Sequence, residues 1–224
     1  MSSFTRTLFA ITWKDLAAEW RSREILSATL VFSILVIFIY NFALDLEVTL
    51  QSDLAAGILW ITFVFTGTLG LNRSMAMEKD RGGLDGLLLA PVDRSAIFFG
   101  KMVANLVIMW VVAVIVVPIF SLLYSIDLIQ PGVGLVILLG SVGYTEVGTL
   151  LAAMAVQART RDMLLPILLF PVALPLLVAA VKATAAFLAP SVVNSVAPWL
   201  DLLIAYDVIF LVVAWLVFDF VVEE

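Results

Sequence analysis

Three ionisable side chains stand inside apolar stretches of this sequence, namely Glu146, Asp207 and Lys182. A charge at the centre of a bilayer costs about 2.5–3.5 kcal/mol on insertion scales, so each of these residues is a candidate for function. A substrate path, a proton relay or a buried pair would use them. The alternatives are a protonated or hydrogen-bonded carboxyl that faces the protein interior, and a lysine whose ammonium reaches outward to the interface. The positions of the three residues leave these interpretations open.

The residue types of the chain exclude several familiar kinds of catalytic site. The chain has no histidine and no cysteine, which excludes disulfide frameworks, the common zinc sites, Ser-His-Asp and Cys-His catalysis, and histidine-ligated haem. A Walker A loop is also missing, because Gly100-Lys101 is followed by Met102 and Ser95 stands where the first glycine belongs. We therefore expect no enzyme activity and no metal site, and any ATP hydrolysis would fall to a separate subunit.

The composition places these residues in a membrane protein. Of 224 residues, 63% are hydrophobic and 13% are charged, and the mean hydropathy is +1.15, which excludes an ordinary water-soluble domain. The formal net charge of −6 argues against a nucleic-acid partner, because a basic surface is needed to neutralise phosphates. The lipid bilayer is therefore the first partner to expect.

Six stretches are long enough to cross that bilayer. A hydrocarbon core of about 30 Å requires about 20 apolar residues in a helix, and the sequence predicts an all-α, polytopic fold with one membrane domain over residues 1–224. The six predicted spans cover approximately residues 25–44, 54–71, 102–124, 132–156, 163–188 and 199–222.

The basic residues predict the orientation of the spans. Positively charged loops remain in the cytoplasm, and the six-span arrangement places eleven of the twelve basic residues on one side, with Lys182 as the exception. Both termini are therefore expected in the cytoplasm. The eleven residues are Arg6, Lys14, Arg21, Arg23, Arg73, Lys79, Arg81, Arg94, Lys101, Arg159 and Arg161.

An amphipathic helix is predicted over residues 4–24, ahead of the first span. Phe9, Trp13, Leu16 and Trp20 recur at helical spacing, with basic residues elsewhere on the helix, which is typical of a helix lying in the membrane interface. It is either a simple anchor or an elbow that passes force from a cytoplasmic partner into the first span. The candidate residues in it are Trp13, Lys14, Asp15, Glu19 and Arg21.

The segment 72–101 is the longest predicted cytoplasmic loop. Its consecutive leucines Leu87, Leu88 and Leu89 need a surface against which to be buried, and a docking site for another protein would provide one. The alternative is that these leucines fold back against the ends of the spans. The candidate residues for coupling to an ATP-binding partner are Asn72, Arg73, Glu78, Arg81, Leu84, Asp85, Leu87, Leu88 and Pro91.

Two predicted spans carry marked features of their own. Gly140, Gly143 and Gly148 form a small-residue face in the fourth span that favours close helix packing. The fifth span contains Pro166, Pro171 and Pro175, and each proline removes a backbone donor, so we expect that helix to bend.

Three segments together resemble the haem exporter protein B family, the permease subunit of the cytochrome c maturation ABC transporter. The most specific is LWITFVFTGTLGLNRSMAMEKDRGGLDGLLLAPVDRSAIFFGK at 59–101, joined by KDLAAEWRSRE at 14–24 and VGTLLAAMAVQARTRDMLLPILLFPVALPLLVAA at 147–180. Thr66 and Glu146 depart from the family pattern, which has apolar residues there. The positions carried over are Asn72, Arg73, Glu78, Leu84, Asp85, Leu88, Leu89, Ala90 and Pro91.

The resemblance implies an ABC-2-like half-transporter that works as a homodimer in the bacterial inner membrane. An ATP-binding subunit would dock beneath it, and other cytochrome c maturation membrane proteins and a haem chaperone would be its further partners. Haem would be a transported or handled ligand rather than a covalently bound cofactor. Two mechanisms remain open: the dimer carries haem itself, or it transmits ATP-driven motion that releases the haem-loaded chaperone at the periplasmic side. A permease for another cargo and a secondary transporter are the alternative functions.

Overall fold

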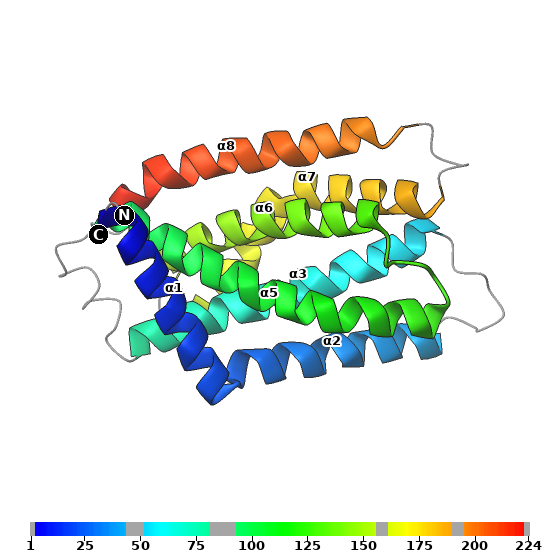
Figure 1. Ribbon diagram of the computed structural model, residues 1–224, viewed down its shortest axis with the longest axis horizontal. Coiled ribbons are helices and arrows are strands. Elements are labelled where there is room, and N and C mark those ends of the chain that lie inside the picture. The colour runs from blue at the N-terminus through cyan, green and yellow to red at the C-terminus, as the bar shows by residue number, and fades with distance from the viewer. Residues whose placement is uncertain (1–2, 44–51, 81–92, 156–160, 190–194, 222–224) are drawn as a thin grey trace.

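The computed structural model describes residues 3–43, 52–80, 93–155, 161–189 and 195–221, and these ranges contain helices and no strand (Figure 1). The all-α prediction is therefore confirmed. The helices are α1 (Ser3–Ser22), α2 (Glu24–Ala43), α3 (Ser52–Asp80), α5 (Arg94–Tyr124), α6 (Pro131–Ala155), α7 (Arg161–Leu188) and α8 (Ala197–Val221).

The six helices from α2 to α8 are each long and apolar enough to cross a membrane, which confirms the six predicted spans. Two of them extend beyond the apolar stretches that the sequence marks. Helix α3 continues to Asp80 through charged residues that favour helix, and α5 already begins at Arg94. The start of α5 is fixed by Asp93, whose Oδ1 accepts a hydrogen bond of 3.0 Å from the backbone N–H of Ser95. Much of the segment 72–101 is therefore helix rather than loop.

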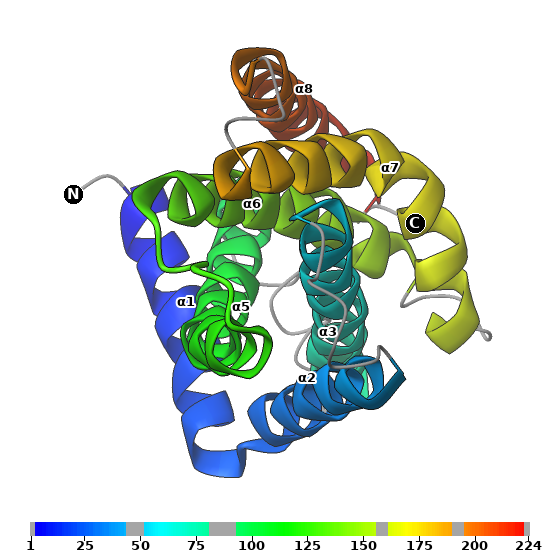
Figure 2. The same cartoon turned by 90° about the vertical axis from the view of Figure 1, so that its right-hand side faces the viewer.

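Helix α3 lies at the centre of the bundle and contacts α2, α5, α6 and α7 (Figure 2). Helix α8 packs on the outside, against α5, α6 and α7, and α7 changes direction along its length, as its three prolines predict. Helix α1 does not run with the others. It lies across the side of α5, at the end of the bundle where α1 begins and α8 ends (Figure 1). We call this the basic end, because Arg73, Lys79, Arg94 and Lys101 all lie there.

The close packing predicted for the small residues of the fourth span is confirmed, but the glycines do not share one face, because Gly143 meets α7 and α8. In α6, Gly140 packs against the ring of Trp60 in α3, and Gly148 packs against Leu71 of the same helix. Trp60 is 2% exposed and its Nε1 donates a hydrogen bond of 2.9 Å to Thr184 Oγ1 in α7. Small residues allow helices to approach closely where lipid offers no hydrophobic driving force for association.

Buried hydroxyl groups add specific links between the helices. Ser33 and Thr66 lie 2.7 Å apart across α2 and α3, and Thr68 and Tyr144 lie 2.6 Å apart across α3 and α6. In an apolar environment a polar side chain must find a partner within the protein. The hydroxyl of Thr66 therefore has its partner in the hydroxyl of Ser33.

We expect Gly140→Ala to destabilise the bundle, because the added methyl group has no room beside the fixed ring of Trp60. Overpacking of this kind costs about 1–3 kcal/mol, which thermal unfolding in detergent would show as a lowered Tm. The matched control is Gly134→Ala in the same helix, where nothing lies within 4 Å of the new methyl group. Equal melting temperatures for the two variants would contradict the packing described for α6.

Candidate functional site

A buried lysine joins three helices at the basic end. Lys101, in the second turn of α5, is 1% exposed. Its Nζ donates hydrogen bonds of 2.8 Å to Oε2 of Glu78, near the end of α3, and of 3.2 Å to Oδ2 of Asp15 in α1. An ammonium group taken out of water needs such partners, because its desolvation costs several kcal/mol.

A second lysine completes the group from the solvent side. Lys14 donates to both carboxylate oxygens of Glu78 at 2.8 Å and forms an ion pair of 3.1 Å with Oδ1 of Asp15. Its side chain is 46% exposed, whereas those of Asp15 and Glu78 are only 13% and 11% exposed. We call Lys14, Asp15, Glu78 and Lys101 the lysine–carboxylate cluster. Two cations and two anions balance in it, so the junction of α1, α3 and α5 carries no net charge.

The pKa values of two cluster members follow from this arrangement. Burial alone would raise the pKa of Glu78, but the charges and hydrogen bonds of Lys101 and Lys14 outweigh it and hold the pKa below the ordinary value of 4.5. Burial likewise lowers the pKa of Lys14, but Glu78 and Asp15 outweigh it and raise the pKa above 10.5. The two groups therefore keep each other charged across the neutral range.

Close packing holds α1 against the first turns of α5. Thr12 Oγ1 donates a hydrogen bond of 3.0 Å to the carbonyl oxygen of Gly100. A Cβ atom at Gly100 would lie 2.9 Å from Cβ of Ile11 and 3.1 Å from the carbonyl oxygen of Leu8, so only glycine permits this approach. Ile11 is 5% exposed. Beside the lysine–carboxylate cluster, α1 and α5 are thus also held together by a closely packed apolar contact.

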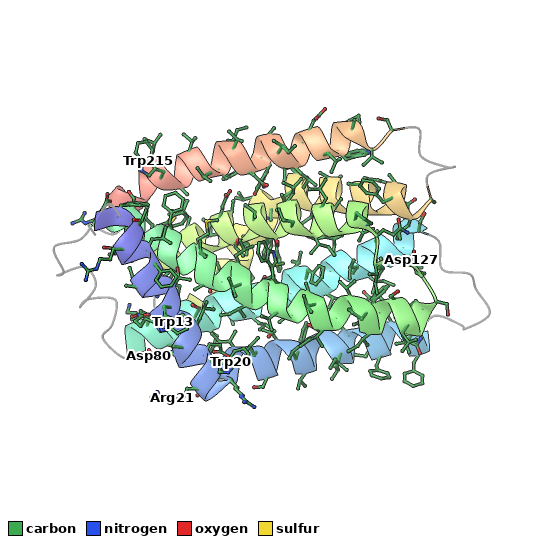
Figure 3. The ribbon with its side chains drawn as sticks, viewed as in Figure 1. Trp13, Trp20, Arg21, Asp80, Asp127 and Trp215 are labelled. Atoms are coloured by element: carbon green, nitrogen blue, oxygen red, sulfur yellow. The ribbon has the colours of Figure 1, made fainter. Side chains whose placement is uncertain are left out.

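The face of α1 opposite the lysine–carboxylate cluster is apolar and exposed. Phe9, Trp13 and Trp20 are 64%, 65% and 70% exposed, and the rings of Phe9 and Trp13 stack with centroids 6.4 Å apart. Figure 3 shows Trp13, Trp20 and Arg21 on the part of α1 that leads to α2. This face matches the amphipathic interfacial helix that the sequence predicts.

A one-residue elbow connects α1 to α2. Only Arg23 separates the two helices, in a left-handed conformation with φ of 56°. Glu19, which is 4% exposed, accepts a hydrogen bond of 2.8 Å from the backbone N–H of Leu26 through Oε1, which caps the first turn of α2. Arg73 then joins α2 to α3 through an ion pair of 2.7 Å with Glu24.

The coupling residues predicted from the sequence divide into two groups. Asn72, Arg73 and Glu78 lie in the last turns of α3, and the first two line a cavity of about 520 Å³ between α2 and α3. The rest of the predicted set falls in the segment 81–92, outside the described residues, and comprises Arg81, Leu84, Asp85, Leu87, Leu88 and Pro91. That segment begins after Asp80, two residues beyond Glu78 in α3, and ends before Asp93, about two turns ahead of Lys101 in α5.

The intramembrane candidates do not form one site. Glu146 in α6 and Asp207 in α8 are 0% and 8% exposed and interact electrostatically, with Asp207 packed against Gly143 one turn before Glu146. Both oxygens of Glu146 and one of Asp207 have no hydrogen-bond partner among the described residues. Lys182 lies apart from them and pairs with Asp53 at 3.3 Å, where both side chains are about half exposed or more.

Sequence reasoning missed the central residue of the cluster. From the sequence, Lys101 is only one of the basic residues of the predicted loop 72–101. Its partners are 86 and 23 residues away in the chain. One signal was available: Gly100, directly before it, marks a close backbone approach at that turn.

We expect Lys101→Met to destabilise the protein by about 3 kcal/mol, because it leaves two partly buried carboxylates with Lys14 as their only cation in the cluster. The measurement is the shift in Tm in detergent. The matched control is Lys182→Met, which breaks an exposed ion pair and should cost below about 1 kcal/mol. A Lys101 variant as stable as the control would show that the buried ammonium contributes nothing to the fold.

The lowered pKa of Glu78 predicts a pH dependence with a definite sign. A carboxyl group whose pKa is lower in the folded state contributes stability above its unfolded pKa and loses it as the pH falls through the folded value. We expect wild-type Tm to fall more steeply below about pH 4.5 than that of Glu78→Gln. Parallel curves through acid pH would contradict the assigned role of Glu78.

Comparison with known proteins agrees with this architecture. A sequence model for the family described as CcmB protein matches residues 6–223. Heme exporter protein B of Rhodobacter capsulatus is 27% identical over 172 residues, which cover 75% of this chain and 78% of that protein. The protein of the same name from Bradyrhizobium diazoefficiens is 26% identical, covering 70% of this chain and 71% of its own length, and the one from Pseudomonas aeruginosa is 25% identical, with 68% and 69% covered. With nearly its whole length matched, the chain belongs to the CcmB protein family.

Proposed function

We propose that this chain is the membrane permease subunit of an ABC transporter in cytochrome c biogenesis, and that the cargo it serves is haem. Its membership of the CcmB protein family and the name Heme exporter protein B borne by its relatives support the assignment. So do the six helices able to cross a membrane. The protein would reside in the bacterial inner membrane as a homodimer, together with other membrane proteins of the pathway.

ATP hydrolysis would take place in a separate subunit bound at the basic end. The sequence has no Walker A loop, and the segment 81–92, with its leucines, lies between the end of α3 and the start of α5. On the positive-inside rule the basic end faces the cytoplasm, and both termini lie there with it. A cytoplasmic ATPase would therefore meet this segment directly.

The observation that carries the proposed coupling is the position of Lys101. Its ammonium binds Glu78 on α3 and Asp15 on α1 from the second turn of α5. A push on the segment 81–92 displaces the ends of α3 and α5, and the lysine–carboxylate cluster makes α1 follow. Through the one-residue elbow at Arg23, the movement then reaches the first span.

Haem handling would take the form of force transmission rather than iron ligation. With no histidine and no cysteine, this chain lacks the usual axial ligands. We therefore favour ATP-driven release of a haem-loaded chaperone at the periplasmic side over passage of haem through this subunit. ATP-dependent haem movement into vesicles that hold the transporter without the chaperone would contradict this choice.

We expect the double variant Glu78→Gln, Lys101→Met to keep its ATP-binding subunit and lose its function. The substitutions remove one anion and one cation, so the net charge is unchanged while the ion pairs that join α1, α3 and α5 are lost. The measurements are co-purification of the ATP-binding subunit in mild detergent and the amount of mature c-type cytochrome in cells, which should fall about tenfold or more.

The control is Asp53→Asn, Lys182→Met, which removes an exposed ion pair at the opposite end of the bundle with the same change in charge. It should leave both measurements unchanged. Full cytochrome maturation in the first variant would refute the coupling role of the cluster. Failure of wild-type protein to retain any ATP-binding subunit would refute the proposed function itself.

A further inference from the structure

Two buried carboxyl groups lie where α6 packs against α8. Glu146 and Asp207 stand well inside their helices, both of which are long and apolar enough to cross a membrane. The two residues are 0% and 8% exposed. Both oxygens of Glu146 and Oδ1 of Asp207 are buried without a hydrogen-bond partner among the described residues. An ionised carboxylate in such a place lacks the donors that would stabilise its charge.

The two carboxyl groups converge at Gly143 of α6. A Cβ atom at Gly143 would overlap with Oδ1 of Asp207, so this oxygen occupies the space that the glycine leaves open. Glu146 follows three residues later and lies on the same side of the helix. Because helical side chains lean toward the N-terminus of their helix, the side chain of Glu146 leans toward the turn that holds Gly143. The electrostatic interaction between the two carboxyl groups agrees with this placement.

The neighbouring titratable groups supply no counter-charge to the pair. Tyr206 interacts electrostatically with both carboxyl groups, and Tyr144 lies beside it. The hydroxyls of Tyr144 and Tyr206 donate hydrogen bonds of 2.9 Å and 3.1 Å to backbone carbonyl oxygens of α3 and α7. The lysines of the adjacent helices α5 and α7, Lys101 and Lys182, form ion pairs with other carboxylates. Two negative charges at this place would therefore repel each other without compensation.

We propose that Glu146 and Asp207 form a proton-binding site, in which both carboxyl groups are protonated and neutral at neutral pH. A proton requires no cavity, whereas a hard metal cation would require about six oxygen ligands. Protonation removes both charges and gives the pair hydrogen-bond donors of its own. The bound protons allow α8 to pack closely on α6, and this holds independently of the proposed transport function.

The test is infrared spectroscopy of the full-length protein in detergent at neutral pH, where a protonated carboxyl group shows a C=O stretching band that a carboxylate lacks. We expect Glu146→Gln and Asp207→Asn each to remove part of this band, and the double variant to remove both parts. Each substitution replaces a neutral carboxyl by a neutral amide of similar shape, so the fold should be kept. The matched control is Asp201→Asn in α8, whose side chain is exposed, and it should leave the band unchanged.

A second measurement needs no variant, so it decides the question even if a substitution prevents folding. Asp207 is the only buried aspartate among the described residues. Aspartate that carries ¹³C in its side-chain carboxyl should therefore shift part of the wild-type band to lower frequency. A band that does not move on labelling, or that stays intact in both single variants, would overturn the proposal. So would a wild-type Tm that rises with sodium concentration and no longer does so in Glu146→Gln, because a bound cation would then neutralise the pair.

Discussion

The ammonium group of Lys101 is buried at a place where three helices meet, and the architecture of the basic end follows from that. The ammonium has hydrogen-bond acceptors only while Asp15 and Glu78 stay within hydrogen-bond distance. Each partner lies on a different helix, so the requirement fixes α1 and the end of α3 relative to α5. Replacing such an ion pair by apolar residues is often harmless to stability, but removing one partner is not. The arrangement therefore acts as a constraint on position more than as a source of stability.

The rest of the bundle is held by different means, because lipid is as apolar as the side chains that would be buried. Close approach at Gly140 and Gly148 and hydrogen bonds such as those from Ser33 to Thr66 and from Thr68 to Tyr144 supply the specificity. These contacts are short-ranged and lie deep among the spans. Charges, in contrast, are concentrated at the basic end, where water can stabilise the exposed members such as Lys14.

The sequence predicts those features that depend on local pattern. Runs of about 20 apolar residues predict the six spans, and the recurrence of Phe9, Trp13 and Trp20 predicts the amphipathic helix, because both follow from helical periodicity. Lys14, Asp15, Glu19 and Glu78 were singled out one at a time, yet their pairing was not predicted. Ion pairs between helices produce no periodic pattern in the sequence, and the partners of Lys101 come from two distant parts of the chain. The nearness of Glu146 and Asp207 depends likewise on how α6 and α8 pack.

The elbow explains why α1 must be tied so firmly. Helix α1 is joined to α5 through Thr12 and Gly100 near its middle, and to α2 through a single residue, Arg23, at its end. In the coupling that we propose, rotation of α1 about its contact with α5 would move the start of α2. Glu19 extends this coupling, because one of its oxygens caps α2 while the helix that carries it is fixed by the lysine–carboxylate cluster.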